Sequence, residues 1–114
     1  MTMQQDMLAL IKGVESNAWA AELPPEPIFP AALFEIDVQP EKGWTAGATY
    51  ANFIVTVYLF NPSKSNLMTK ATAMRAAFEA YPWLLAEEES GDAAFEDWPE
   101  QFAYYMIFRT RGHV

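Results

Sequence analysis

Three stretches of the chain have the apolar pattern of β-strands. Residues 33–39 (LFEIDVQ) alternate cleanly between apolar and polar side chains, which is typical of a strand with one buried face. Residues 49–60 end in FIVTVYLF, where Thr56 is the main interruption of a run that is apolar on both faces. Residues 102–111 (FAYYMIFRTR) also lack a fully polar face. Because a strand with one wet face should alternate, the second and third stretches are expected to need cover on both faces.

Two further stretches have the period of a helix. In residues 3–23 the apolar residues recur at i, i+3, i+4, i+7 and i+11, and Gly13 is expected to weaken the helix locally. In residues 65–81 they recur at spacings of four and three, with Ser63 or Ser65 as the predicted N-cap. The two stripes comprise Met7, Leu10, Ile11, Val14 and Ala18 in the first helix and Leu67, Ala71, Met74, Phe78 and Tyr81 in the second.

The connecting segments complete a coarse topology. Residues 24–30 hold four prolines and predict an extended connection, while residues 40–48 have the composition of a projecting loop. Residues 86–100 are expected to form an acidic surface excursion. The predicted order is α-β-β-α-β within a single domain, 1–114, and a further short strand before the last one is left open. We expect an α+β two-layer sandwich: a mostly antiparallel sheet of three to five strands with two helices packed on one face.

The pattern does not determine what covers the second face of this sheet. That face would carry Ile54, Tyr58 and Phe60, together with either the Tyr105/Ile107 set or the Tyr104/Met106/Phe108 set. For Tyr58, Phe60 and Tyr104 two interpretations remain: a filled core within the chain, or a subunit interface. Trp44, beside Lys42 in the 40–48 loop, either folds back on its own domain or anchors a partner, since Trp is enriched in interface hot spots. The candidate interface residues are therefore Lys42, Trp44, Ile54, Tyr58, Phe60 and Tyr104.

Charge and composition narrow the class of partner. The 114 residues include no cysteine, so disulfides and thiolate metal sites are excluded. The formal net charge is −8, with 15 acidic and 7 basic residues, which argues against binding to nucleic acid or to anionic membranes. The N-terminal sequence lacks the pattern of a signal peptide, and no apolar run approaches the length of a membrane span. We expect a soluble protein that is not secreted by a signal peptide.

The sequence contains few candidate residues for catalysis or for binding a metal or cofactor. The single histidine, His113, lies next to the end of the sequence and is expected to be a tail residue, and the five glycines form no phosphate-binding loop. The acidic run 87–92 lacks the spacing of a calcium loop, so a solvated loop is favoured. Glu35 and Asp37 project side by side from one strand, but nothing predicts the deep cleft that a catalytic pair would need. We expect no catalysis, no cofactor and no metal site.

The order of these elements resembles a known family. An amphipathic helix, a proline-containing connection and two strands are followed by VTVYLFNPSKSNLMTKATAMRAAF, in which a hydrophobic–Thr–hydrophobic strand leads through a Ser/Asn/Lys turn into an Ala-rich helix. This pattern is similar to that of the tail-terminator and tail-completion proteins of long-tailed bacteriophages, the minor tail protein U-like group. The resemblance covers most of the chain as architecture, but residues 83–101 match nothing in the family.

The resemblance implies a structural role without catalysis. Such proteins form a ring, typically a hexamer, that caps the tail tube and contacts head-completion proteins. The implied partners are further copies of the chain, tail-tube proteins and head-completion proteins, and the implied location is the host bacterial cytoplasm during assembly and then the virion tail. An alternative from another class is a small-molecule or peptide-binding α+β module that uses the aromatic sheet face as a pocket wall.

Overall fold

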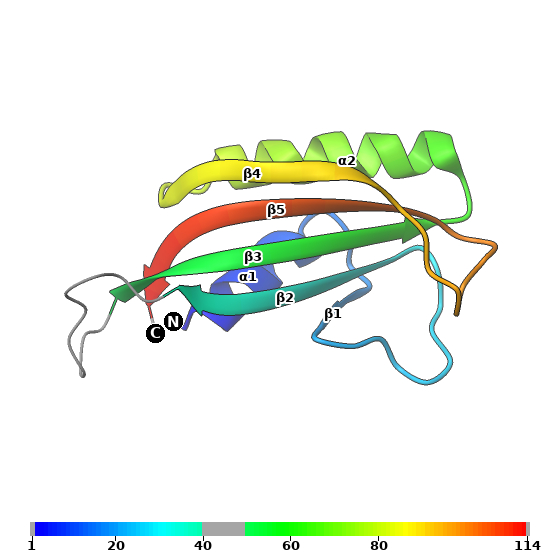
Figure 1. Cartoon of the computed structure of the whole chain (residues 1–114), viewed down its shortest axis with the longest axis horizontal. Helices are drawn as coiled ribbons and strands as arrows, with labels where there is room; N and C mark the ends of the chain where they lie inside the picture. Colours follow the sequence, from blue (N-terminus) through cyan, green and yellow to red (C-terminus); the bar gives the residue numbers. More distant parts are fainter. Residues whose placement is uncertain (1, 40–49, 114) are drawn as a thin grey trace.

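The computed structural model describes residues 2–39 and 50–113, which form a five-stranded sheet and two helices (Figure 1). The sheet order is β1-β2-β3-β5-β4; β1 runs parallel to β2 and every other pair is antiparallel. Both helices pack on one side of the sheet, which confirms the predicted α+β two-layer class. The elements are α1 (Met3–Lys12), β1 (Ala18–Ala20), β2 (Ala31–Gln39), β3 (Tyr50–Asn61), α2 (Lys64–Glu79), β4 (Leu84–Ala93) and β5 (Phe102–His113).

The main core lies between the helices and the sheet, on the side that we call the helix face. Alternate residues of the central strand β3 point into it because side chains in a strand alternate between the two faces. Four of them, Phe53, Val55, Val57 and Leu59, are buried there. The Phe78 ring of α2 stacks on the Phe108 ring of β5, with centroids 3.9 Å apart. The central strand is therefore covered on this face from within the chain.

Helix α1 is shorter than the predicted helix 3–23, which is a correction. A capping box begins the helix: the Thr2 hydroxyl accepts from the Gln5 backbone N–H, and the Thr2 N–H donates to the Gln5 side chain. The helix ends at Lys12, directly before Gly13, and Ala18 already belongs to β1. Gly13, Ser16 and Asn17 favour caps and turns over continued helix. The chain therefore turns here and adds a strand that the helical period did not predict.

Helix α2 agrees closely with the sequence. It begins after Ser63, whose hydroxyl accepts from the Asn66 N–H, so the first of the two predicted caps is the observed one. Its buried residues are Leu67, Ala71, Met74 and Phe78, four of the five residues of the predicted stripe. The fifth, Tyr81, lies beyond the end of the helix at Glu79 and is only partly buried.

The acidic stretch 86–100 is only partly the surface excursion that we expected. Glu87, Glu88, Glu89 and Asp92 are exposed, but residues up to Ala93 belong to β4, which pairs with β5 through two register shifts. The predicted order α-β-β-α-β therefore lacked the edge strand β1, whereas β4 occupies the place of the further short strand that the sequence left open before the last one. Acidic residues, serine and glycine are poor strand formers, so β4 depends on pairing with β5 rather than on its own propensity.

A bidentate ion pair ties β4 to α2. The Arg75 Nε and Nη2 atoms lie 3.0 Å from the two carboxylate oxygens of Glu87, and this hydrogen bonding raises the pKa of Arg75. Nearby, the Tyr104 hydroxyl lies 3.3 Å from Ser90 Oγ. These contacts hold an edge strand of low intrinsic propensity against the helix layer.

A left-handed residue ends β1. Ala21 has φ 68°, a conformation that costs a non-glycine residue about 1–2 kcal/mol. Its N–H donates to the Phe34 carbonyl at 2.8 Å, and the chain then leaves the sheet for the proline-rich connection. The turn therefore fixes the length of β1 at three residues.

The Ala21→Gly variant is expected to be more stable than the wild type by about 0.5–1 kcal/mol. Glycine removes the left-handed strain, and its larger entropy in the unfolded chain offsets part of the gain. The measurement is the free energy of unfolding in urea. Ala20→Gly is the matched control and should lose about 0.5–1 kcal/mol, because Ala20 lies within β1 and has no positive φ. Equal destabilisation of both variants would contradict the prediction.

Candidate interaction surface

The sheet side opposite the helices, which we call the outer face, is built from alternate residues of four strands. The register of the strands shows which residues lie on the outer face. Tyr58 of β3 lies opposite Leu33 of β2 and Tyr105 of β5. Of the two β5 sets that the sequence left open, the outer one is therefore Tyr105 and Ile107. The outer residues of β2, β3 and β5 include Ala31, Leu33, Glu35, Asp37, Ile54, Thr56, Tyr58, Phe60, Ala103, Tyr105, Ile107 and Arg109.

One end of the outer face is covered by the chain itself. Phe60 is 1% exposed and lies under an aromatic cap formed by Phe29 of the proline-rich connection and by Phe95 and Trp98 of the β4–β5 connection. The ring centroids of these three residues lie 5.9, 5.0 and 5.4 Å from that of Phe60. In Figure 1 the two connections meet at the same end of the sheet. Two segments far apart in the sequence thus cooperate to close this end.

The other end of the outer face carries no covering element in the described part of the chain. Ile54, Thr56 and Ile107 are half-buried there, and Glu35 and Asp37 are exposed. Arg109 and Glu88 form an ion pair at 3.1 Å, and the Tyr105 hydroxyl donates to Glu89 at 2.7 Å, which raises the pKa of Tyr105. The uncovered half is therefore a mixed surface with isoleucines at its centre and carboxylates along both sides.

The candidate residues from the sequence do not all meet on this surface. Ile54 lies on the uncovered half, and Tyr58 lies at the border, where its ring contacts Phe95 edge-on at 5.5 Å. Phe60 is buried within the chain, which is the filled-core interpretation. Tyr104 pairs with Leu59 and packs on the helix face, away from the other three. Lys42 and Trp44 lie outside the described residues.

Sequence reasoning missed Phe29, Phe95 and Trp98 as the cover of Phe60. The available signal was the placement of large aromatic residues inside otherwise polar or proline-rich connections, since such side chains usually find an apolar surface on which to pack. The aromatic end of the sheet is filled by these rings. It therefore gives no support to the alternative of a ligand pocket walled by the aromatic face.

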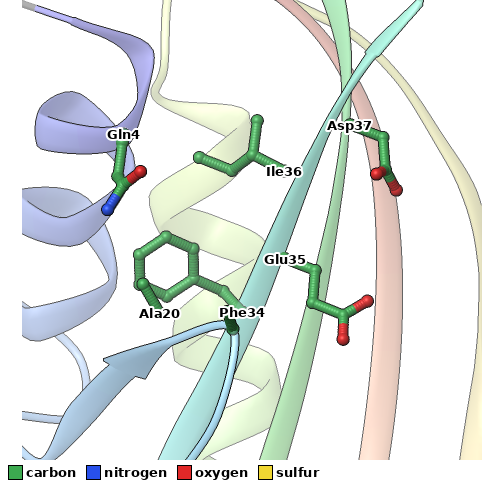
Figure 2. Close-up of a pocket in the computed structure, with 7 residues that line it drawn as sticks. Gln4, Ala20, Phe34, Glu35, Ile36 and Asp37 are labelled. Carbon is green, nitrogen blue, oxygen red and sulfur yellow. The ribbon is translucent and has the colours of Figure 1, made fainter.

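The described residues contain open hollows but no cluster of metal ligands. Among residues 2–39 and 50–113 no three His, Cys, Asp or Glu side chains are grouped so that they could hold a metal ion. Neither described helix has the length and apolar character needed to cross a membrane. Open hollows do occur, and one of about 370 Å³ lies between α1 and β2, lined by Gln4, Ala20, Ala21 and residues 34–37 (Figure 2).

Comparisons with known proteins give a likeness of fold. No protein-family model matches the chain, and no curated protein matches it. Among solved structures, the chain is similar to a chain of the "Virion of native gene transfer agent (GTA) particle", with a TM-score of 0.59 and 13% sequence identity. The match covers 99% of this chain and 96% of the other. At this identity the likeness shows a shared fold over nearly the whole length of both chains.

Trp98→Ala is expected to destabilise the protein by about 2–3 kcal/mol. Full burial of a Trp contributes about 3–5 kcal/mol relative to Ala, and Trp98 is half-buried over Phe60 and Phe29. The free energy of unfolding in urea measures the loss. The control Phe102→Ala removes a ring that is 48% exposed and should cost less than about 1 kcal/mol. A Trp98→Ala loss no larger than that of the control would show that the cap is loosely packed.

Proposed function

We propose that this protein is a structural component of a phage or prophage-like particle, and that it assembles as a ring at the end of the tail tube in the role of a tail terminator or completion protein. The single observation that carries the proposal is the fold likeness to a chain of a gene transfer agent virion over nearly the full length of both chains. The resemblance of the strand–turn–helix segment 55–78 to tail-terminator proteins points in the same direction. In this role the protein performs no catalysis and needs no cofactor.

The uncovered half of the outer face is the surface that we assign to contacts between subunits. A cyclic ring uses two different patches of each subunit, so an apolar patch on one copy meets another region of the next. Ile54 and Ile107 supply half-buried apolar area at the centre of this surface, and Tyr58 extends it toward the aromatic cap. Phe60 and Tyr104 are not part of this proposal because one is buried and the other faces the helices.

The remaining parts of the proposal follow from the family resemblance. Lys42 and Trp44 are proposed as contacts to a neighbouring subunit or to the tail tube. The ring is proposed to be a hexamer. The partners are tail-tube and head-completion proteins, and the site of assembly is the bacterial cytoplasm before the protein enters the virion tail. The net charge of −8 suits a ring that DNA passes without binding.

Ile54→Asp is expected to break the ring while leaving the subunit folded. In an interface the new carboxylate would be buried without a partner, at a cost of about 3–5 kcal/mol per contact, or more than about a hundredfold in affinity. In the free subunit it would lie half-exposed between Arg109 on one neighbouring strand and Asp37 on the other, so the fold should tolerate it. Light scattering behind a sizing column, over a range of protein and salt concentrations, gives the molar mass.

Ile28→Asp is the matched control, because Ile28 is 78% exposed and lies in the proline-rich connection. The wild type and this control should give one discrete species of ring mass, and Ile54→Asp should give the monomer. A wild-type protein that stays monomeric at every concentration, both alone and in the presence of tail tubes, would overturn the proposal. A ring that survives Ile54→Asp would move the interface to another surface.

A further inference from the structure

One sheet edge stays unpaired for half of its length. On the side of β2 away from β3, pairing with β1 covers only Ala32 to Phe34. Ala32 donates to the Asn17 carbonyl at 2.9 Å, and the Phe34 carbonyl accepts from Ala21. Strand β2 continues to Gln39, and within the described residues no strand pairs with that continuation on this side. We call this stretch, residues 35–39, the free β2 edge.

Backbone alternation identifies the groups that the free β2 edge presents. Ala32 and Phe34 direct their hydrogen-bonding groups toward β1, so the residues of the same parity, Ile36 and Val38, direct theirs the same way. Their N–H and C=O groups therefore point outward, and no strand of the described residues lies beside them. Such a row of unpaired groups is a template for another strand. The free β2 edge begins at the level of the left-handed turn at Ala21, because the chain leaves the sheet there.

The side chains along the free β2 edge form two rows of opposite character. Figure 2 shows Phe34 and Ile36 pointing toward α1 and the hollow beside Gln4, while Glu35 and Asp37 point to the opposite side of the strand. On the apolar side Ile36 is only partly buried, and Val38 is 50% exposed. On the other side both carboxylates are exposed, and neither forms an ion pair with another described residue.

We propose that the free β2 edge binds an extended segment of another protein by strand addition, and that this segment alternates apolar residues with Lys or Arg. The backbone groups of Ile36 and Val38 would pair with the added strand, as in other complexes formed by adding a strand to a sheet edge. Its apolar side chains lie in the hollow beside α1, and its basic side chains lie across from Glu35 and Asp37. Opposite charges on neighbouring strands stabilise the pairing.

The charges of this chain argue against a second copy as the occupant. The other long edge of the sheet is β4, whose side chains include Glu87, Glu88 and Glu89. Adding that edge to the free β2 edge would bring these carboxylates beside Glu35 and Asp37, and like charges on adjacent strands are destabilising. The remaining edge, β1, has three residues and no charge. No edge strand of the described chain is both long and basic, so the partner is a different protein.

The test uses ¹⁵N-labelled full-length protein and a capped peptide of sequence KVKTKVK as the probe. The peptide should shift the amide signals of Ile36 and Val38 and slow their hydrogen exchange, because these amides become hydrogen-bonded. Two control peptides separate charge from pattern: EVETEVE reverses the charge, and VVKKTKK keeps the composition without the alternation. Both should bind at least about tenfold more weakly.

Two protein variants locate the site. Val38→Pro removes one outward N–H without removing a bond to β3, since proline is tolerated where the N–H of an edge strand faces solvent, and it should weaken binding about fivefold. Val38→Ala keeps that N–H and is its matched control. The double variant Glu35→Gln/Asp37→Asn should weaken binding about tenfold and reduce its dependence on salt.

Several results would overturn the proposal. They are the absence of shifts at Ile36 and Val38, shifts confined to β4 or to the outer face, equal binding of the three peptides, and unchanged binding by both Val38→Pro and the double variant. Val38→Pro could instead lower the molar mass of the protein alone. That result would show that the free β2 edge is a contact between copies, and it would also contradict the proposal of a different partner protein. The ring proposal is tested separately, because it is measured by the effect of Ile54→Asp on molar mass.

Discussion

The structure depends on the need to cover a central strand that is apolar on both of its faces. Strand β3 lies in the middle of the sheet, with Val55 and Val57 buried on one side and Phe60 buried on the other. Burial of each such side chain is worth roughly 1.5–3 kcal/mol, which is a large share of the stability of a small domain. A layer of helices is sufficient for only one of the two faces. The other face has to be covered by connections or by another chain.

The chain solves half of that problem with irregular segments. The proline-rich connection and the β4–β5 connection bring Phe29, Phe95 and Trp98 over Phe60, so a second small core forms without a second layer of secondary structure. Aromatic rings suit this use, because a few of them bury a large area at little cost in side-chain entropy. The cap ends near Tyr58. Beyond it, Ile54 and Ile107 keep a partly buried apolar surface whose cover the proposed ring contact would supply.

The parts of the fold that could be predicted from sequence are those in which one strong local pattern agrees with the tertiary packing. The stripe of α2 and its Ser63 cap are such a case, and so are the two central strands. Strand β1 was not predicted and β4 was only left open as a further short strand, and both outcomes have physical reasons. Strand β1 has only three residues and was absorbed into a helical period, while β4 is acidic and is held by β5 and Arg75. The position of Ile54 on the outer face could be predicted from the alternation of β3, and its contact with another subunit stays a prediction. The free β2 edge could not be predicted, because it exists only where β1 stops.

The acidic residues that make β4 difficult to recognise as a strand in the sequence also affect how the sheet edges pair with other chains. An exposed sheet edge invites pairing with other chains, and charged side chains and bulges are common protections against it. Strand β4 has both, since Glu87, Glu88 and Glu89 lie where its register shifts. Glu35 and Asp37 give the free β2 edge the same sign of charge, so edge-to-edge stacking of copies is disfavoured at both ends of the sheet. In the two proposals, copies of the chain contact one another through the outer face, and the free β2 edge stays available to a partner of opposite charge.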